Sequence, residues 1–334
     1  LLRSTGMKKT ILAALMAGSF IASAFSATVI KLGYSTGSTD PRAVASKLFK
    51  EEVEKNSKGS ITVELYDSSK LPTIGMKASD TNLIESIINR GPVDMTVSSA
   101  GNFGIYATNV GVSALPFLFT DFDKAWKFMD SDIVKGVNKE LESSNIVVLA
   151  HYDNGFRCVT TTSRPVTKVA DMKGLKIRTP ANQIVMETMT ALGARPEPLD
   201  FGKLPAALKA GQFDSQENPI PVIYNNKLYQ VQKYLAITNH SYDAMPLVIK
   251  KDVWNKLSAA EKKVVQDAAI KAQNLNRTLV KDQTNSLVAS LKKEGMVVTR
   301  PDLGEFKKTT QSVFEIFSEI YGKDLMDKVI AFTK

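Results

Sequence analysis

Three short segments between residues 151 and 219 decide the fold and the site expected of this chain: DNGFR at 153–157, GLKIRTP at 174–180 and QENP at 216–219. Arg157 follows an apolar run, 146–150, that predicts a buried strand. Arg178 ends a short predicted strand, and the Thr-Pro pair after it is a typical helix start. Asn218 also follows a short predicted strand and precedes a proline. Each segment therefore places a long or amide side chain at the end of a strand.

These strand ends are where a ligand is expected. In α/β sheets, ligands bind in the crevice beyond the carboxyl ends of the strands. The guanidinium groups of Arg157 and Arg178 each offer planar paired donors that match a carboxylate, and the Asn218 amide would assist them. The alternative is that both arginines form structural ion pairs with acids such as Asp153 or Glu217. These segments alone leave both interpretations open.

Strands and helices alternate along most of the chain. The 334 residues, 43% of them hydrophobic, suffice for one large or two medium domains. One alternating series runs from Val29 to Ala150 and a second begins at Asn154, a pattern typical of parallel-rich α/β sheets. A strand near 245–250 is expected to return the chain to the first domain.

A long helix is predicted after residue 257. Ser258-Ala259-Ala260-Glu261 is a capping box, and no proline or glycine follows until Gly295. Such a helix would be ~50 Å long, which exceeds one domain of this size. The alternative, a coiled coil, requires a strict heptad that the apolar positions do not keep. We expect one helix that braces both domains, followed by a terminal amphipathic helix from Leu303 to Phe332.

The chain resembles the extracytoplasmic solute-binding proteins of TRAP transporters, the DctP-like family with sialic-acid- and sugar-acid-binding members. The similar blocks include LPFLF at 115–119, DMKGLKIRTP at 171–180 and the run from ALGARPEPLDFGKL to AITNH, 191–240, in family order and spacing. The resemblance spans roughly 29–306. It implies that Arg178 holds the ligand carboxylate in a salt bridge and that Arg157 and Asn218 assist.

The resemblance also implies a two-lobed periplasmic binding fold, with two parallel-rich mixed sheets, hinge strands and a long spine helix spanning both lobes. The expected divisions are a signal peptide with upstream residues, 1–26; lobe I, 27–152 plus about 243–284; lobe II, 153–242 plus about 285–312; and a C-terminal helix, 313–334, packing back on the body.

The first residues have the pattern of a Sec-type signal peptide. A basic start at Met7-Lys8-Lys9 precedes the apolar stretch 11–21 and the small-residue motif 22–24. An N-terminal membrane anchor would need a longer apolar span. A periplasmic location is therefore expected. Loss of residues 1–24 would lower the net charge from +9 to +6, and no basic cluster with interleaved aromatic residues argues for nucleic-acid binding.

Enzyme chemistry is not expected, and neither is a cofactor or a metal. The sequence has two histidines, His151 and His240, and no metal-ligand spacing, Walker loop or nucleophile elbow. The single Cys158 cannot form an internal disulfide, and we expect it to pack as a small apolar residue. Pairing His151 with Cys158 as base and nucleophile is the alternative.

The resemblance suggests which residues surround the anchor. Phe201 would cover one face of a sugar, and a set of polar side chains would contact its hydroxyls: Ser35, Ser38, Ser99, Asn102 and Tyr242. Sialic-acid binders have an asparagine at the position of Ser35 and a glutamate at that of Ser99, which argues against sialic acid here. Glu217 is expected to balance an arginine rather than touch the ligand.

These residues favour a hexuronate such as glucuronate or galacturonate as the ligand. A C4-dicarboxylate is the alternative, with Arg157 serving the second carboxylate. The expected partners are the organic acid and a TRAP membrane permease, with no nucleic acid, and the protein is expected to be a monomer. An orphan sensor with the same fold is a further alternative.

Overall fold

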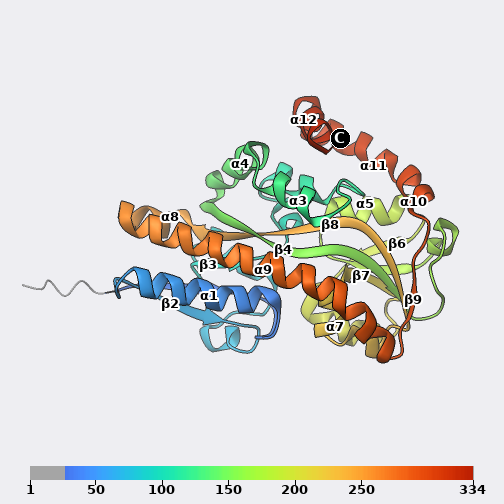
Figure 1. The fold of residues 1–334 in the computed structure, drawn as a ribbon, viewed down its shortest axis with the longest axis horizontal. Helices are drawn as coiled ribbons and strands as arrows, with labels where there is room; N and C mark the ends of the chain where they lie inside the picture. Colours follow the sequence, from blue (N-terminus) through green and yellow to red (C-terminus); the bar gives the residue numbers. More distant parts are fainter. Residues whose placement is uncertain (1–26, 334) are drawn as a thin grey trace, which may run out of the picture.

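A computed structural model describes residues 27–333 of the chain (Figure 1). Its strands form one mixed nine-stranded sheet in the order β2-β1-β3-β8-β4-β7-β5-β6, with β9 paired to β8. The strands are β1 Thr28–Gly33, β2 Ile61–Tyr66, β3 Met95–Val97, β4 Ile146–Thr161, β5 Lys176–Thr179, β6 Arg195–Pro198, β7 Ser215–Pro219, β8 Tyr234–Lys250 and β9 Val297–Thr299. The predicted signal peptide lies outside the described residues.

The prediction of two separate sheets is wrong because β4 and β8 are much longer than expected. β4 has 16 residues and β8 has 17, and they pair antiparallel along their length. A strand was expected at 146–150, but β4 continues through the polar residues that follow and ends at Thr161. Gly155 adopts φ +110° beside a register shift, where a side chain would be strained. This bulged pair, here called the β4–β8 crossing, joins both ends of the sheet.

Helices cover the sheet on both faces (Figure 1). Their bounds are α1 Pro41–Asn56, α2 Asp80–Ile88, α3 Phe122–Met129, α4 Asp132–Asn138, α5 Gln183–Ala191, α6 Leu204–Lys209, α7 Ile220–Asn225, α8 Lys251–Lys256, α9 Ala259–Lys293, α10 Leu303–Thr309, α11 Gln311–Tyr321 and α12 Lys323–Thr333. Short 3₁₀ segments include η2 Ala100–Phe103, η3 Thr108–Ala114 and η6 Phe201–Lys203. In the described part of the chain, no helix has the length and apolarity that crossing a membrane requires.

The two ends of the sheet have their own apolar cores. At the β2-β1-β3 end, called the β1 end, α1 buries Phe49 and Val53 against Ile30 and Ile61. Asp40 caps this helix by accepting from the Arg42 backbone N–H, and Pro41 begins it. At the β7-β5-β6 end, called the β5 end, separate clusters form under α5, α6 and α7.

The predicted long helix is confirmed as α9, which has 35 residues. Its capping box is present, because Ser258 Oγ accepts from the Glu261 backbone N–H and the Glu261 carboxylate accepts from the Ser258 backbone N–H. The helix packs on α1, on β4 and on α7, and so runs along the sheet from one end to the other (Figure 1). Arg277 anchors it to Asp130 through two hydrogen bonds of 2.7 and 2.8 Å.

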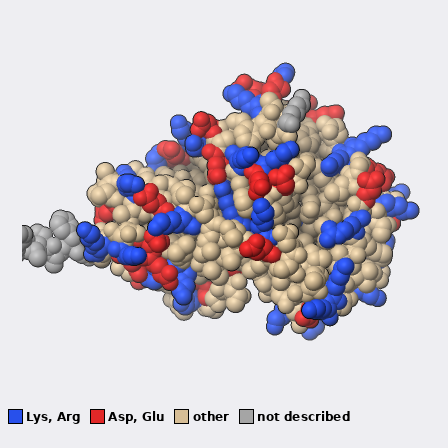
Figure 2. Space-filling model, viewed as in Figure 1, with Lys and Arg blue, Asp and Glu red and all other residues tan. Residues whose placement is uncertain are grey.

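The predicted single terminal helix is instead three helices, α10, α11 and α12. Gly322 ends α11 with φ +81°, a conformation that favours glycine. Val313, Phe317 and Val329 of these helices pack into the core cluster that also contains η3 and α4 residues. Figure 2 shows charges of both signs scattered over the face in view, without a basic stripe there.

Candidate ligand-binding site

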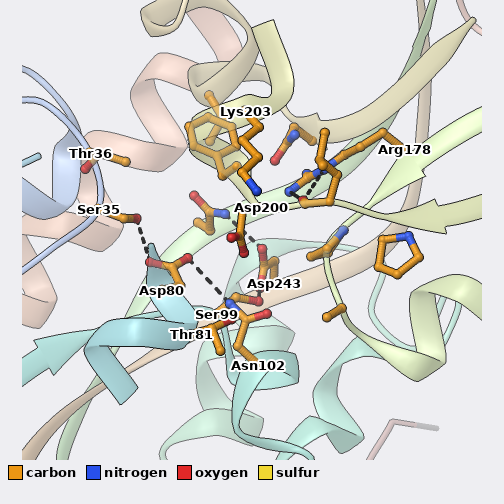
Figure 3. A pocket seen from close by; sticks show the side chains of 18 of the residues that line it. Ser35, Thr36, Asp80, Thr81, Ser99, Asn102, Arg178, Asp200, Lys203 and Asp243 are labelled. Atoms are coloured by element: carbon orange, nitrogen blue, oxygen red, sulfur yellow. Dashed lines mark hydrogen bonds between the residues drawn. The ribbon is translucent and has the colours of Figure 1, made fainter. Parts of the chain in front are cut away.

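A cavity of about 340 Å³ lies between the β1 end, the β5 end and the β4–β8 crossing (Figure 3). Polar and charged side chains from all three parts line it, with a few apolar ones. The lining residues are Ser35, Thr36, Arg42, Asp80, Thr81, Ser99, Asn102, Asn154, Arg157, Arg178, Pro180, Ala181, Pro198, Leu199, Asp200, Phe201, Lys203, Asn218, Val222 and Asp243.

Arg178 reaches the cavity from strand β5 and is 2% exposed. Its Nε donates to the carbonyl oxygen of Leu199 at 2.8 Å, and Nη2 donates to the same oxygen. The Phe201 ring centroid lies 5.9 Å from its Cζ. Among residues 27–333 it forms no ion pair, and burial lowers its pKa to about 10. Arg178 is therefore a buried cation with no carboxylate in ion-pair contact among the described residues; Glu217, Asp80 and Asp200 act on its pKa only from a greater distance.

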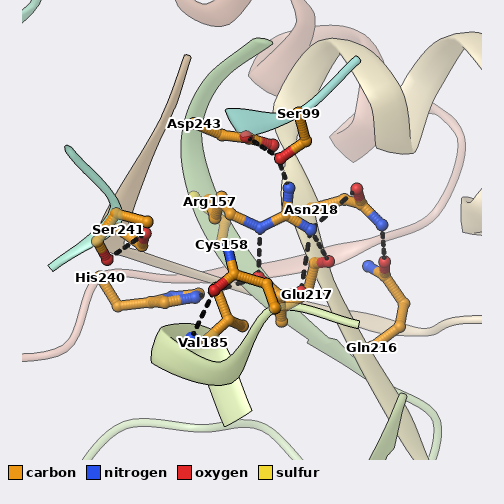
Figure 4. Close-up of polar contacts among 12 residues, drawn as sticks. Ser99, Arg157, Cys158, Val185, Gln216, Glu217, Asn218, His240, Ser241 and Asp243 are labelled. Atoms are coloured by element: carbon orange, nitrogen blue, oxygen red, sulfur yellow. Dashed lines mark hydrogen bonds and ion pairs between the residues drawn. The ribbon is translucent and has the colours of Figure 1, made fainter. Parts of the chain in front are cut away.

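Arg157 lies in the β4–β8 crossing and has the opposite environment (Figure 4). It donates to both carboxylate oxygens of Glu217, one through Nη2 at 2.8 Å, and its Nη1 donates to Asp243 at 2.5 Å. Burial alone would lower the pKa of Arg157, but the two carboxylates outweigh it and raise that pKa. The structural ion pair left open by the sequence is therefore present at Arg157, and Glu217 balances it as expected.

Asn218 links the Arg157 network to the cavity lining. Its Oδ1 accepts from Arg157 Nη2 at 3.1 Å, and its Nδ2 donates to Gln216 Oε1 at 2.6 Å (Figure 4). These bonds fix the orientation of the amide at the end of β7. Arg157, Arg178 and Asn218 therefore line one cavity.

Asp243 in β8 organises the middle of the cavity. Its carboxylate accepts from Arg157, from the Ser99 hydroxyl and from Asn154 Nδ2, the last at 2.8 Å. Sequence reasoning missed Asp243 because β8 was expected to begin only at residue 245. The sequence carries one signal for this longer strand: apolar and β-branched residues stand both before and after 238–243.

A second polar group lines the cavity at the β1 end. Asp80 accepts from Ser35 Oγ at 2.5 Å and from Asn102 Nδ2 at 3.4 Å (Figure 3). Arg42, from the first turn of α1, donates through Nε to Asp40 at 3.3 Å, and its Nη1 lies 3.8 Å from Asp80 Oδ1. Arg42 and Asp80 were also missed, because both lie in helices and the expected site was built from strand ends.

Two of the predicted site residues do not line the cavity. Tyr242 is 2% exposed and packs against Phe119 and Phe156, with ring centroids 5.6 and 5.4 Å away. Adjacent strand residues point to opposite faces, so Tyr242 turns into the core while Asp243 lines the cavity. Ser38 is exposed in the loop before α1. The other seven, including Phe201, Ser99, Ser35 and Asn102, do line it.

Two contacts join the β1 end to the β5 end beside the cavity. Ser79 Oγ donates to Asp200 Oδ1 at 3.4 Å. Gly101 in η2 meets Asn182, the N-cap of α5, so closely that a Cβ on Gly101 would lie 1.8 Å from Asn182 Nδ2. The two ends are therefore in contact in this structure beside the cavity.

The histidine and cysteine residues take part in structural contacts. His151 Nε2 lies 3.3 Å from Asn138 Nδ2, and burial lowers the His151 pKa to about 4. Cys158 Sγ contacts Asn239 Oδ1 at 3.3 Å, and burial raises the Cys158 pKa to about 11, so the thiol is not activated. Within residues 27–333 there is no cluster of three or more potential metal ligands.

Comparison with known proteins identifies the family. The family model of bacterial extracellular solute-binding proteins, family 7 (DctP), matches residues 32–320. The sialic acid-binding periplasmic protein SiaP of Vibrio cholerae is 32% identical, covering 95% of this chain and 97% of SiaP.

Two solved TRAP periplasmic solute-binding proteins have the same fold. The protein from Polaromonas sp. JS666, bound to D-erythronate, is 34% identical with a TM-score of 0.86 over 91% of this chain and 98% of its own. The protein from Pseudomonas putida F1, with bound D-glucuronate, is 30% identical with a TM-score of 0.84 over 90% and 96%. The α/β fold and the family resemblance are thus confirmed, and this family binds solutes rather than catalysing reactions. The chain is a TRAP periplasmic solute-binding protein of the DctP family.

Proposed function

We propose that this protein captures a hexuronate, such as glucuronate or galacturonate, and delivers it to a TRAP permease. One observation carries the proposal. Arg178 is a buried guanidinium on the cavity wall without an ion-pair partner among the described residues. Burying a charge without a partner is costly, so a site that retains one suits a ligand that brings the opposite charge. A planar carboxylate matches the fork of an arginine side chain.

The charges around the cavity favour one carboxylate rather than two. Glu217 and Asp243 already neutralise Arg157, and Asp40 and Asp80 flank Arg42. A second carboxylate near either arginine would meet these acids and be repelled. The expectation that Arg157 serves a second carboxylate is therefore not supported by this geometry.

The rest of the lining suits hydroxyl groups. Asp80 and Asp243 retain acceptor capacity, and Ser35, Ser99 and Asn102 hold their carboxylates in place. Phe201, beside Arg178, offers an apolar face. The cavity is at the low end of the ~300–1,000 Å³ usual for small-molecule sites, which favours a single small sugar acid. The solved relatives from Polaromonas and Pseudomonas are bound to hydroxylated monoacids.

The capture mechanism rests on contacts to both ends of the sheet. We assign lobe I to 27–152 plus about 243–284 and lobe II to 153–242 plus about 285–312, with residues 313–334 packed back on the body. Arg178 on lobe II would hold the carboxylate while polar groups on lobe I hold hydroxyls. A ligand that bridges the lobes binds the closed arrangement better and so shifts the population towards it. We propose an exported monomer whose closed form docks on the permease.

A C4-dicarboxylate is the second candidate, and Lys203 is the observation that favours it. Lys203 lines the cavity, is exposed and forms no ion pair among residues 27–333. Lys203 is therefore a cation available to a second carboxylate in the cavity.

Thermal shift assays with glucuronate, galacturonate, sialic acid, succinate and malate test the proposal. At a ligand concentration about 100 times Kd, binding adds roughly 2.7 kcal/mol of stability, a readily measured shift in Tm. We expect the hexuronates to raise Tm more than sialic acid. A rise with succinate or malate and none with the hexuronates would replace the first candidate by the second.

A further inference from the structure

A chain of buried polar side chains leads away from the cavity behind Asn218. Asn218 Nδ2 donates to Gln216 Oε1 at 2.6 Å, and Gln216 Nε2 donates to Thr160 Oγ1 at 2.7 Å. The Thr160 hydroxyl donates in turn to Gln232 Oε1 at 2.9 Å. These four residues are here called the amide chain, and Figure 4 shows its first link. Each is at most 4% exposed, and of the four only Asn218 lines the cavity.

The strand register brings the side chains of the amide chain together. Gln216 and Asn218 are two positions apart in β7 and therefore lie on the same face of the sheet. Gln216 pairs with Thr160 of β4, so their side chains are cross-strand neighbours. Gln232 lies just before β8, whose Leu235 pairs with Thr160. Polar residues thus occupy a row of buried positions, where proteins usually place apolar ones.

The far end of the amide chain fixes the direction of its hydrogen bonds. Gln232 Nε2 donates to the Val231 carbonyl oxygen at 3.1 Å. Because a carbonyl oxygen only accepts, Gln232 turns its Oε1 towards Thr160 and takes the hydroxyl proton. Thr160 has no second proton, so it accepts from Gln216 Nε2, which leaves Gln216 Oε1 for the amide of Asn218.

The cavity end of the amide chain requires the same orientation. Arg157 Nη2 can only donate, and it donates to Asn218 Oδ1 at 3.1 Å. The Asn218 amide is therefore held at both of its polar atoms, the oxygen by Arg157 and the nitrogen by Gln216. Hydrogen bonds that follow one another in a chain strengthen each other. Loss of one link is therefore expected to loosen the Asn218 amide.

We propose that Gln216, Thr160 and Gln232 are positioning residues, which hold the Asn218 amide in the orientation that the ligand carboxylate requires. This inference rests on the proposed function, because it takes the carboxylate to be held at Arg178 with Asn218 beside it. None of the three positioning residues lines the cavity. Their effect on affinity is therefore exerted through Asn218.

The test measures glucuronate affinity by calorimetry. Gln216→Met removes the direct partner of Asn218 Nδ2 and is expected to weaken binding about 10-fold, the effect of losing one neutral hydrogen bond. Thr160→Val removes a hydroxyl one link further away and is expected to weaken binding about 3-fold. Thr160→Ser restores the hydroxyl and should restore the affinity, although it changes the packing of this position as well.

A double-mutant cycle shows whether the amide chain acts through Asn218. Asn218→Ala should weaken glucuronate binding at least as much as Gln216→Met does. Adding Gln216→Met or Thr160→Val to Asn218→Ala should then cause no further loss of affinity. A purely structural role of the chain would instead give the same loss with and without the Asn218 side chain.

Thr96→Val is the matched control for Thr160→Val. Thr96 is also a fully buried strand residue, and its Oγ1 donates to the Gly33 carbonyl oxygen at 2.9 Å, but it lies in β3 outside the cavity lining. Both threonine variants should lower Tm, whereas only Thr160→Val should weaken binding. If Thr160→Val does not fold, as its melting curve would show, Gln216→Met and its cycle with Asn218→Ala decide the question.

Each result has a defined meaning. Wild-type affinity in both Gln216→Met and Thr160→Val would overturn the positioning role and leave the proposed function intact. Undiminished losses beside Asn218→Ala, or unchanged affinity in Asn218→Ala itself, would also overturn it. If the wild type does not bind glucuronate, the proposed ligand fails. The same variants are then measured with the acid that raises Tm most, because the chain serves the carboxylate and not the sugar. If no acid binds, both proposals fail.

Discussion

Two arginines line the same cavity in opposite electrostatic surroundings. Arg157, in the β4–β8 crossing, is neutralised by Glu217 and Asp243. Arg178, at the end of β5, is equally buried, but within residues 27–333 its side chain donates only to the Leu199 carbonyl oxygen. The crossing thus pairs its cation with carboxylates of the protein, whereas the β5 end leaves one cation without such a pair. Replacing Arg157 is therefore expected to lower the stability of the protein, and replacing Arg178 is expected to lower its affinity for the ligand.

The largest expected effect follows from Arg157→Met. This change leaves Glu217 and Asp243 buried without their common cation, and breaking a buried pair typically costs about 3–5 kcal/mol. Urea unfolding without ligand measures the loss. Adding Glu217→Gln should recover part of it, because one of the stranded charges is then removed. A loss below about 1 kcal/mol would mean that the crossing does not depend on this charge balance.

Arg178→Lys should act on affinity instead. Lysine keeps the charge but loses the planar fork, and truncating one partner of a buried charge pair costs about 2–5 kcal/mol. We expect the lower end, about 30-fold weaker binding of glucuronate, and a greater loss for Arg178→Ala. Unfolding without ligand should change little, since Arg178 forms no ion pair among the described residues.

Arg195→Lys is the matched control for Arg178→Lys. Arg195 also donates through Nε and Nη2 to one backbone carbonyl, that of Gly174, but it is exposed and outside the cavity lining. It should leave calorimetric affinity unchanged. Unchanged affinity in Arg178→Lys, or a clear loss of stability there, would instead make Arg178 a structural residue like Arg157.

The contact between the two ends of the sheet gives a third prediction. Gly101→Ala places a Cβ 1.8 Å from Asn182 Nδ2, and Asn182 cannot turn away without losing the cap it forms on the Val185 backbone N–H. The ends should then stay apart, and glucuronate affinity should fall about tenfold, ~1.4 kcal/mol. Gly136→Ala, where a Cβ meets nothing within 4 Å, is the control. Full affinity in Gly101→Ala would show that binding does not require this approach.

The sequence predicted some of these features and not others for physical reasons. The α9 helix was predictable because its cap and its uninterrupted composition are local signals. The single sheet was not, because β4 and β8 carry buried polar residues such as Asp153 and Asn154 whose partners lie far along the chain. Strands are predicted from the spacing of apolar residues, so a strand that carries paired polar groups is predicted as a loop.

The same limit applies to the site. Arg178 and Asn218 lie at strand ends, where sequence reasoning searches for ligands, and both line the cavity. Asp243 lies within a strand, and Arg42 shares the first turn of α1 with an ordinary cap. Their importance comes from tertiary neighbours 86 and 38 positions away, Arg157 and Asp80, which no local pattern shows.

The last prediction concerns pH and tests the protonation of Asp153, which lies in the crossing. Burial raises the pKa of Asp153 to about 7 from 3.8 and lowers that of His151 to about 4 from 6.5. For Asp153, the native state binds more protons between pH 3.8 and 7, so its contribution to stability is lost as pH rises. For His151, the unfolded state binds more protons between pH 4 and 6.5, so its contribution is lost as pH falls.

Because these two contributions oppose each other across pH 4 to 6.5, they nearly cancel in the wild type. Asp153→Asn keeps an acceptor for Trp126 Nε1, which donates to Asp153 at 2.6 Å. It removes the pH-dependent contribution of Asp153 and leaves that of His151. Relative to the wild type, the variant should gain stability with rising pH in this window, by up to about 1.4 kcal/mol per unit. Urea unfolding at pH 4.5, 5.5 and 6.5 measures it, with the exposed Asp267→Asn as control. If the unfolding free energies of Asp153→Asn and the wild type change with pH in parallel, Asp153 is ionised throughout this pH window. The crossing then carries the charge of Asp153 in addition to those of Arg157 and its partners.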